Sequence, residues 1–315
     1  MLPLTGHSPA LRPPSLDELR QVEEEVSRLL ESADLGSTGG RGFWVLNVGS
    51  AYSLAAAQIV YWPLRQLSEQ RVEQEPLEAY TYHHAAYHEE NMSMIVFVEP
   101  GGEGVAARGL STLSIMGSRA LVIGPPLPHV LKPYGEAHTY IELALQRIDV
   151  GMLAAAAHLA RILVERASTI KVRVERLGRE YSSLTEAYRW VVNRYRGDLV
   201  SLAERLKDST TLYCSPTLSG ACSMLSTIAT SRGYPRPSVA SLSSAVTEIA
   251  LGAAPKRLVL LTTGAEADIA REAATRARLT GREAFHLLID TDPLTAPLYA
   301  ALLAEALPVR GDSHS

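Results

Sequence analysis

The chain of 315 residues is 46% hydrophobic and 20% charged, and its formal net charge is −4. This length suits two α/β units of about 150 residues each, and the composition is that of a folded globular protein. No Lys/Arg-rich run is present, so nucleic acid is not expected as a partner. No apolar run approaches the ~18 residues of a membrane span and no signal-peptide pattern opens the chain, so we expect a cytoplasmic protein without a membrane partner.

Residue usage adds two weaker indications. Cys214 and Cys222 are eight residues apart, with no histidine at metal-ligand spacing. We interpret them as small buried hydrophobic residues rather than as a disulfide or a zinc site, and we expect no metal. Only four of the 30 basic residues are lysines, which weakly indicates a thermophilic source.

The first part of the chain predicts alternating helices and strands. Ser15 and Glu18 form a capping box that begins a helix reaching Leu30. The segments expected to be extended and buried are Phe43–Val48, 72–80, Met94–Val98 and Ala120–Ile123. Gly49–Ser53 and a helix over Leu54–Leu67 follow the first strand. This alternation predicts a parallel sheet with crossover helices over residues 15–150.

Residues 151–207 predict a helical connector, because long apolar-periodic helices over Met152–Ala167 and Tyr181–Tyr195 have no strand signal between them. The strand pattern begins again in residues 208–308. Its expected extended segments are Thr211–Cys214, Ser238–Ser241, Leu258–Leu261 and Phe285–Ile289. The predicted fold class is therefore α/β, with two tandem doubly wound, flavodoxin-like parallel-sheet halves joined by helices.

Candidate ligand contacts lie in the loops that follow these strands, because ligands of open parallel sheets bind beyond the carboxyl ends of the strands. Small and hydroxylated residues there can cradle an anion with backbone N–H groups. Ordinary helix caps and glycine turns are the alternative reading for each loop. The candidate substrate-binding residues are Gly49, Ser50, Tyr52, Ser53, Gly101, Gly102, Ser215, Thr217, Thr262 and Thr263.

Two loops carry a resemblance to a known family. Val48–Tyr52 followed by an alanine-rich helix resembles the strand, Gly-Ser/Thr-Ser-Tyr and helix signature of the SIS (sugar isomerase) family, and Met94–Ala107 falls where that family has its Ser-Gln-Ser-Gly-Glu-Thr loop. The resemblance extends over most of residues 15–308. In that range the chain is similar to the isomerase half of glucosamine-6-phosphate synthase. It implies tandem SIS-type halves, a sugar phosphate or other carbohydrate derivative as ligand, a homodimer, and phosphosugar aldose–ketose isomerase or deglycase chemistry.

The sequence departs from the family pattern at several functional positions. Ala51 stands where the resemblance places a phosphate-binding serine, and Glu99, Gly101 and Gly104 stand where it places Ser or Thr. A carboxylate at position 99 would repel a phosphate dianion unless the side chain turned away. Thr247–Gly252 resembles the Gly-Glu-Leu-Lys-His-Gly segment, but Leu251 takes the place of the ring-opening histidine and Ala250 that of the lysine.

Isomerisation needs a general base, and Leu251 cannot supply one. Glu248 is the first candidate for a catalytic carboxylate and Glu103 the second, although each could equally be an exposed carboxylate near a helix end. His84 and His88 lie one helical turn apart, as metal ligands can, but a solvated amphipathic face is the favoured reading.

Three functional readings follow. The chain is a phosphosugar isomerase or deglycase, or a non-catalytic SIS-like binding module, sensor or structural dimer; we lean slightly toward binding. The third class, a dinucleotide-dependent oxidoreductase, would need a Gly-x-Gly-x-x-Gly motif after its first strand, and Gly49–Ala51 does not provide it. No cofactor is therefore expected.

Overall fold

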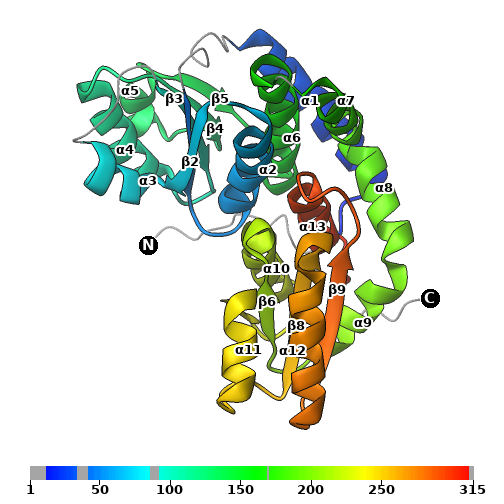
Figure 1. The fold of residues 1–315 in the computed structure, drawn as a ribbon. Helices are drawn as coiled ribbons and strands as arrows, with labels where there is room; N and C mark the ends of the chain where they lie inside the picture. Colours follow the sequence, from blue (N-terminus) through cyan, green and yellow to red (C-terminus); the bar gives the residue numbers. More distant parts are fainter. Residues whose placement is uncertain (1–11, 34–41, 86–91, 169, 312–315) are drawn as a thin grey trace.

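The computed structural model describes residues 12–33, 42–85, 92–168 and 170–311, which form two parallel sheets with helices between and around them (Figure 1). The five-stranded first sheet has the order β2-β1-β3-β4-β5 and the four-stranded second sheet the order β7-β6-β8-β9. The strands are β1 (Gly42–Val48), β2 (Arg71–Pro76), β3 (Met92–Val98), β4 (Ala120–Gly124), β5 (Thr139–Glu142), β6 (Thr211–Cys214), β7 (Ser238–Ser241), β8 (Arg257–Thr263) and β9 (Glu283–Ile289). The predicted α/β fold class with two parallel-sheet halves is confirmed.

Helices connect the strands and cover both faces of each sheet. The helices before β6 are α1 (Leu16–Ser32), α2 (Tyr52–Leu67), α3 (Leu77–Ala79), the π-helix η3 (Tyr80–His84), α4 (Glu103–Ile115), the 3-10 helix η5 (His129–Leu131), α5 (Lys132–Gly135), α6 (Ile148–Ala167), α7 (Lys171–Glu180), α8 (Leu184–Arg194) and α9 (Arg196–Leu206). Those after it are η6 (Pro216–Leu218), α10 (Ser219–Ser231), α11 (Leu242–Ala250), η7 (Gly264–Glu266), α12 (Ala267–Leu279) and α13 (Ala296–Glu305). None of these described helices is long and apolar enough to cross a bilayer.

The two halves share one central hydrophobic core. Strand β1 is buried along its whole length; Phe43 and Val45 point toward the central core, and Trp44 and Leu46 toward a separate outer core under α3 and α4. The central core continues through α2, α6, α10 and α13 to the inner face of the second sheet. A third cluster lies between that sheet and α11 and α12. The halves are therefore held together by buried apolar surface, the largest favourable term in folding.

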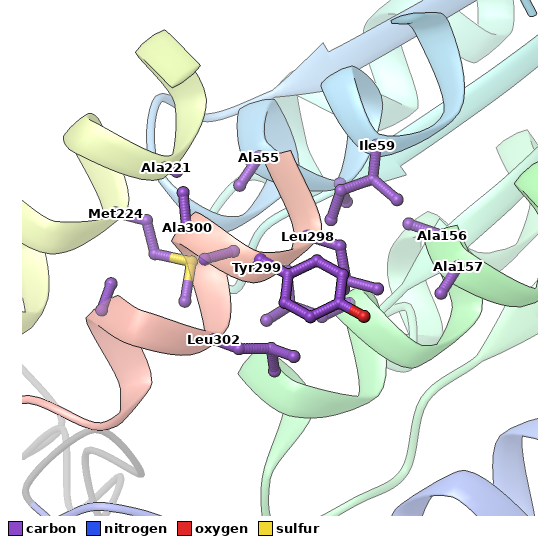
Figure 2. Packing of buried hydrophobic residues seen from close by; sticks show 14 of the residues in the cluster. Ala55, Ile59, Ala156, Ala157, Ala221, Met224, Leu298, Tyr299, Ala300 and Leu302 are labelled. Atoms are coloured by element: carbon purple, nitrogen blue, oxygen red, sulfur yellow. The ribbon is translucent and has the colours of Figure 1, made fainter. Parts of the chain in front are cut away.

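Small side chains let the central helices approach closely. Figure 2 shows Ala55 of α2, Ala156 and Ala157 of α6 and Ala221 of α10 around the α13 residues Leu298–Leu302. At Gly220 a Cβ would lie 2.8 Å from the backbone N and Cα of Ala55, so no larger residue fits there without movement. Gln58 of α2 completes this contact, because its Oε1 accepts from the amide of Gly220 at 2.8 Å and its Nε2 donates to Ser219 Oγ at 2.7 Å.

Four buried charged groups lie at the same junction. The guanidinium of Arg147 donates to Asp149 at 2.8 Å and to Glu305 at 2.9 Å, and Arg232 donates to the same Glu305 oxygen at 3.4 Å. All four side chains are at least nine-tenths buried. Burial and the neighbouring Asp149 raise the pKa of Glu305, whereas the two arginines lower it. These contacts join the start of α6, the end of α10 and the end of α13.

The structure corrects three local expectations. The segment 72–80 is extended only to Pro76, and Leu77 begins helical structure instead. The sequence pattern predicts no strand after Ala120–Ile123 in the first half, but Thr139–Glu142 forms β5, a four-residue edge strand paired with β4. Cys214 and Cys222 form a disulfide between β6 and α10. The pairing links a strand to a helix, a contact that their sequence spacing does not indicate.

The Gly220→Ala substitution should lower the free energy of unfolding by about 1–3 kcal/mol, because the added methyl group meets the backbone of α2. Urea unfolding monitored by circular dichroism measures the change. Gly197→Ala is the matched control, since its Cβ in α9 meets nothing within 4 Å and should leave stability unchanged or raise it by up to about 1 kcal/mol. Equal stabilities of the two variants would contradict the close helix contact.

Removing the disulfide should lower stability by about 2–3 kcal/mol, because it closes a loop of eight residues in the unfolded chain. The Cys214→Ala/Cys222→Ala variant and the wild type are compared by urea unfolding, each with and without reductant. We expect reductant to bring the wild type to the level of the variant. Free thiols in the denatured, unreduced wild type would show that the bond does not form.

Candidate functional site

The loop after β1 holds a carboxylate of the chain itself. The amide of Ala51 and the hydroxyl of Ser53 donate to Glu99 Oε2 at 3.2 and 3.1 Å. Gly49 has a φ of 116°, and a Cβ at this position would lie 2.1 Å from Glu99 Oε2. Only glycine therefore lets the loop close over this carboxylate. Glu99, at the end of β3, thus caps the N-terminus of α2.

This arrangement places Glu99 where an anion would bind. The N-cap residue of α2 is Ala51, whose side chain cannot accept a hydrogen bond from the first turn. Free N–H groups and the positive end of the helix dipole attract phosphates and carboxylates alike. Glu99 turns toward these donors rather than away from them. Of the two predicted serine contacts, Ser53 is buried and bonded to Glu99, whereas Ser50 is exposed.

The loop after β3 is also closed by a carboxylate. Glu103, the first residue of α4, accepts a hydrogen bond from the amide of Gly101 at 3.1 Å. Gly101 has a φ of 90°, and a Cβ on Gly102 would lie 2.8 Å from the side chain of Val48. The turn between β3 and α4 therefore needs glycine at both positions. Burial raises the pKa of the nearby Tyr140 hydroxyl, and the charges of Glu103 and Glu142 raise it further.

Tyr52 faces the interior of the protein rather than the loop. Its ring is 9% exposed and belongs to the central core. Its hydroxyl is buried and has no hydrogen-bond partner among the described residues. Burial raises the pKa of this hydroxyl, and the charges of Glu305 and Asp149 add to the effect. Tyr52 is therefore part of the central core and does not point into the first loop.

The loops of the second half bring four hydroxyls to the carboxyl edge of its sheet. Ser215 Oγ and Thr217 Oγ1 are 2.9 Å apart, after β6. At the end of β8, Thr262 Oγ1 is 2.8 Å from Nε2 of His286 on the neighbouring strand. Thr263 forms a capping box with Glu266, which accepts from both the amide and the hydroxyl of Thr263. A carboxylate of the chain thus again takes the donors of one candidate residue, here Thr263.

Glu248 lies away from these loops. It is two residues before the end of α11, and the chain after it leads to the amino end of β8, whereas the candidate loops follow carboxyl ends. Its Oε2 accepts a hydrogen bond from the hydroxyl of Tyr213 at 2.5 Å. Leu251, just beyond the helix, is 78% exposed. The structure therefore does not bring Glu248 together with Gly49, Ser53 or Thr263, and its catalytic role stays a prediction.

The histidine pair is only partly described. Nε2 of His84 is 3.3 Å from a carboxylate oxygen of Glu75, and its ring lies 5.3 Å from that of Trp44. His88 lies outside the described residues. Among the residues that the structure does describe, no three histidine, cysteine, aspartate or glutamate side chains form a group suited to a metal ion.

Sequence reasoning missed several polar residues near these loops. Gln58 reaches the start of α10, His286 reaches Thr262, and Asp292 lies in the loop after β9. The partners of Gln58 are more than 150 residues away along the chain. No local pattern could have identified them.

Comparisons with known proteins agree with this architecture. No protein-family model matches the sequence, and no curated protein matches it. Among solved structures, the C-terminal domain of glucosamine-fructose-6-phosphate aminotransferase from Francisella tularensis aligns over 97% of this chain and 98% of its own, with a TM-score of 0.67 and 12% identity. The expected SIS fold is confirmed. Glucosamine-6-phosphate deaminase from Thermotoga maritima aligns over 92% and 93%, with a TM-score of 0.57 and 13% identity.

Acidification should destabilise the wild type more than a His286→Asn variant. Burial lowers the pKa of His286, and the charge of Arg271 lowers it further. The unfolded chain therefore takes up a proton near pH 6.5 that the folded protein resists, and the contribution of neutral His286 is full above that pH and is lost below it. Urea unfolding between pH 7.5 and 5 measures the difference. A His129→Asn control, at an exposed histidine, should follow the wild type; identical slopes for all three proteins would contradict the prediction.

Proposed function

We propose that this chain is a carbohydrate-binding protein of SIS fold that performs neither isomerisation nor deglycation. The solved proteins of the same fold include two that are named for amino sugar phosphates, an aminotransferase and a deaminase. Their names support a carbohydrate derivative as the ligand class. A homodimer, implied by the family resemblance, and a cytoplasmic location, expected from the sequence pattern, are part of the same proposal. Light scattering checks the dimer.

The occupied first loop is the observation that carries the non-catalytic part of the proposal. Glu99 Oε2 accepts hydrogen bonds from Ala51 and Ser53, the donors that a phosphate would use. A phosphate at this place would have to displace the carboxylate and then lie beside its negative charge. The family resemblance assigns phosphate binding to this loop. Because Glu99 already occupies the donors of the loop, we expect no sugar phosphate to bind there in this chain.

The two candidate bases support the same conclusion. Proton transfer between adjacent carbons needs a base within hydrogen-bond reach of the substrate. Glu248 of α11 accepts a hydrogen bond from the hydroxyl of Tyr213 on β6, outside the candidate loops. Glu103 accepts one from the backbone amide of Gly101. The alternative function is an aldose–ketose isomerase or deglycase in which Glu248 or Glu103 is released to act as base.

The Glu99→Ala variant should gain affinity for inorganic phosphate, because the substitution frees the N-terminus of α2. Differential scanning fluorimetry should show a larger rise in Tm with phosphate concentration for the variant than for the wild type. Without ligand, the variant should be about 1 kcal/mol less stable, as expected for a lost helix cap. Glu103→Ala removes a nearby charge without opening the first loop and serves as the control. A phosphate response in the wild type equal to that of Glu99→Ala would contradict the occupied loop.

The proposed function is tested by calorimetry and NMR with glucose, glucuronate, glucose 6-phosphate, fructose 6-phosphate and glucosamine 6-phosphate. We expect binding of at least one sugar and no conversion of any of them. Conversion of a sugar phosphate that is lost in Glu248→Gln or Glu103→Gln would establish the alternative. Failure of every sugar to bind a folded protein would overturn the proposal.

A further inference from the structure

A cavity of about 320 Å³ lies where the two halves and the connector meet. Its walls include Trp62 and Gln66 from the last turns of α2, Arg173 from the first turn of α7, Thr217 after β6, and Asp292 and Leu294 after β9. The second sheet directs its carboxyl ends toward α2 and α13 (Figure 1). The cavity is thus beyond the carboxyl edge of an open parallel sheet, the usual place for a ligand.

The cavity is separate from the loops already described in the first half. None of the residues of the first anion loop, Gly49–Ser53, contributes to its wall, and neither does Glu99. Thr217 is the one predicted binding residue that lines it. At 320 Å³ the cavity is at the lower end of the ~300–1,000 Å³ range of small-molecule sites, which suits a monosaccharide better than a nucleotide sugar.

The polar side chains of the wall are available to a ligand. Within the described part of the chain, the side chains of Arg173 and Gln66 take part in no hydrogen bond or ion pair. Asp292 Oδ1 accepts from the amide of Leu294 at 3.0 Å, and its Oδ2 is 3.7 Å from Arg176. The carboxylate keeps unused acceptor positions, because each of its oxygens can accept two hydrogen bonds. Hydroxyl groups of a sugar match such acceptors.

One guanidinium of the wall is free to bind an anionic group. Arg173 makes no ion pair within the described part of the chain, whereas the Asp292 carboxylate lies 3.7 Å from Arg176, which itself pairs with Glu180 at 2.9 Å. A guanidinium binds carboxylate and phosphate groups with paired, charge-assisted hydrogen bonds. Trp62 and Leu294 add apolar surface against which a sugar ring can pack.

We propose that this cavity binds an anionic monosaccharide, whose phosphate or carboxylate contacts Arg173 and whose hydroxyls contact Gln66, Thr217 and Asp292. This inference rests on the proposed carbohydrate-binding function and assigns the place and the ligand class. A ligand in this site contacts α2, α7 and two loops of the second half at once. Its binding therefore stabilises the arrangement of the two halves.

Isothermal titration calorimetry on the full chain tests the site with glucose 6-phosphate, glucuronate, glucose and inorganic phosphate. The first two distinguish a phosphate from a carboxylate as the anionic group. Arg173→Gln should weaken binding of the anionic sugar at least about tenfold, as expected for loss of a charge-assisted hydrogen bond. Arg179→Gln, which changes an exposed arginine of the same helix outside the cavity, should bind like the wild type. Thr217→Val provides a second wall variant and should also weaken binding.

Each result decides a different question. Loss of affinity in Arg173→Gln and Thr217→Val, with none in Arg179→Gln, supports the site. Sugar binding that both wall variants leave unchanged overturns the site but leaves the carbohydrate-binding function standing. Tighter binding of glucose than of either anionic sugar, unaffected by Arg173→Gln, overturns the anionic class. If none of the sugars binds, both the site and the proposed function are wrong.

Discussion

The close contact between α2 and α10 is the constraint on which the rest of the structure depends. Gly220 lets α10 approach the backbone of Ala55, and Gln58 satisfies the polar groups at the start of α10. Because α2 also packs on α6 and the first sheet, this contact makes the cores of the two halves continuous. It also sets the last turns of α2 above the loops that follow β6 and β9. The cavity between them is a consequence of this packing.

Side chains from distant elements cap several helices. Glu99 caps α2, Glu23 of α1 accepts from the amides of Leu184 and Thr185 at the start of α8, and Gln58 caps α10. Each acceptor satisfies N–H groups that a helix leaves free at its N-terminus. The same donors are what an anion-binding loop offers to a ligand. In this chain they are used for internal contacts, so the residues that look like a phosphate loop in the sequence stabilise the fold instead.

The buried charge cluster shows how the junction is fixed in one arrangement. Isolated buried charges are costly, and a buried ion pair often contributes little net stability. The carboxylate of Glu305 nevertheless pairs with both Arg147 and Arg232. Arg232 also donates to the backbone oxygens of Glu305 and Leu307. These directional contacts are satisfied only when α6, α10 and α13 hold their observed positions. Apolar packing supplies the attraction between the halves, and the charges select the geometry.

The sequence by itself determined the features that depend on neighbouring residues. Buried apolar runs such as Phe43–Val48 identified the central strands, and Ser15 with Glu18 identified the first helix, because periodicity and capping act over a few residues. The edge strand Thr139–Glu142 was missed because it is short and only partly buried. The sequence showed that a glutamate at position 99 departs from the family pattern. It did not show in which direction the side chain of Glu99 points.

Only the tertiary structure decided what the candidate loops do. Glu99 meets Ala51 across 48 residues, and Gln58 meets Gly220 across 162. Such contacts depend on how sheets and helices pack, which no local pattern encodes. The same holds for the cavity, whose walls come from α2, α7 and two loops of the second half. Short-range physical preferences therefore fixed the elements, and long-range packing fixed which polar groups remain free for a ligand.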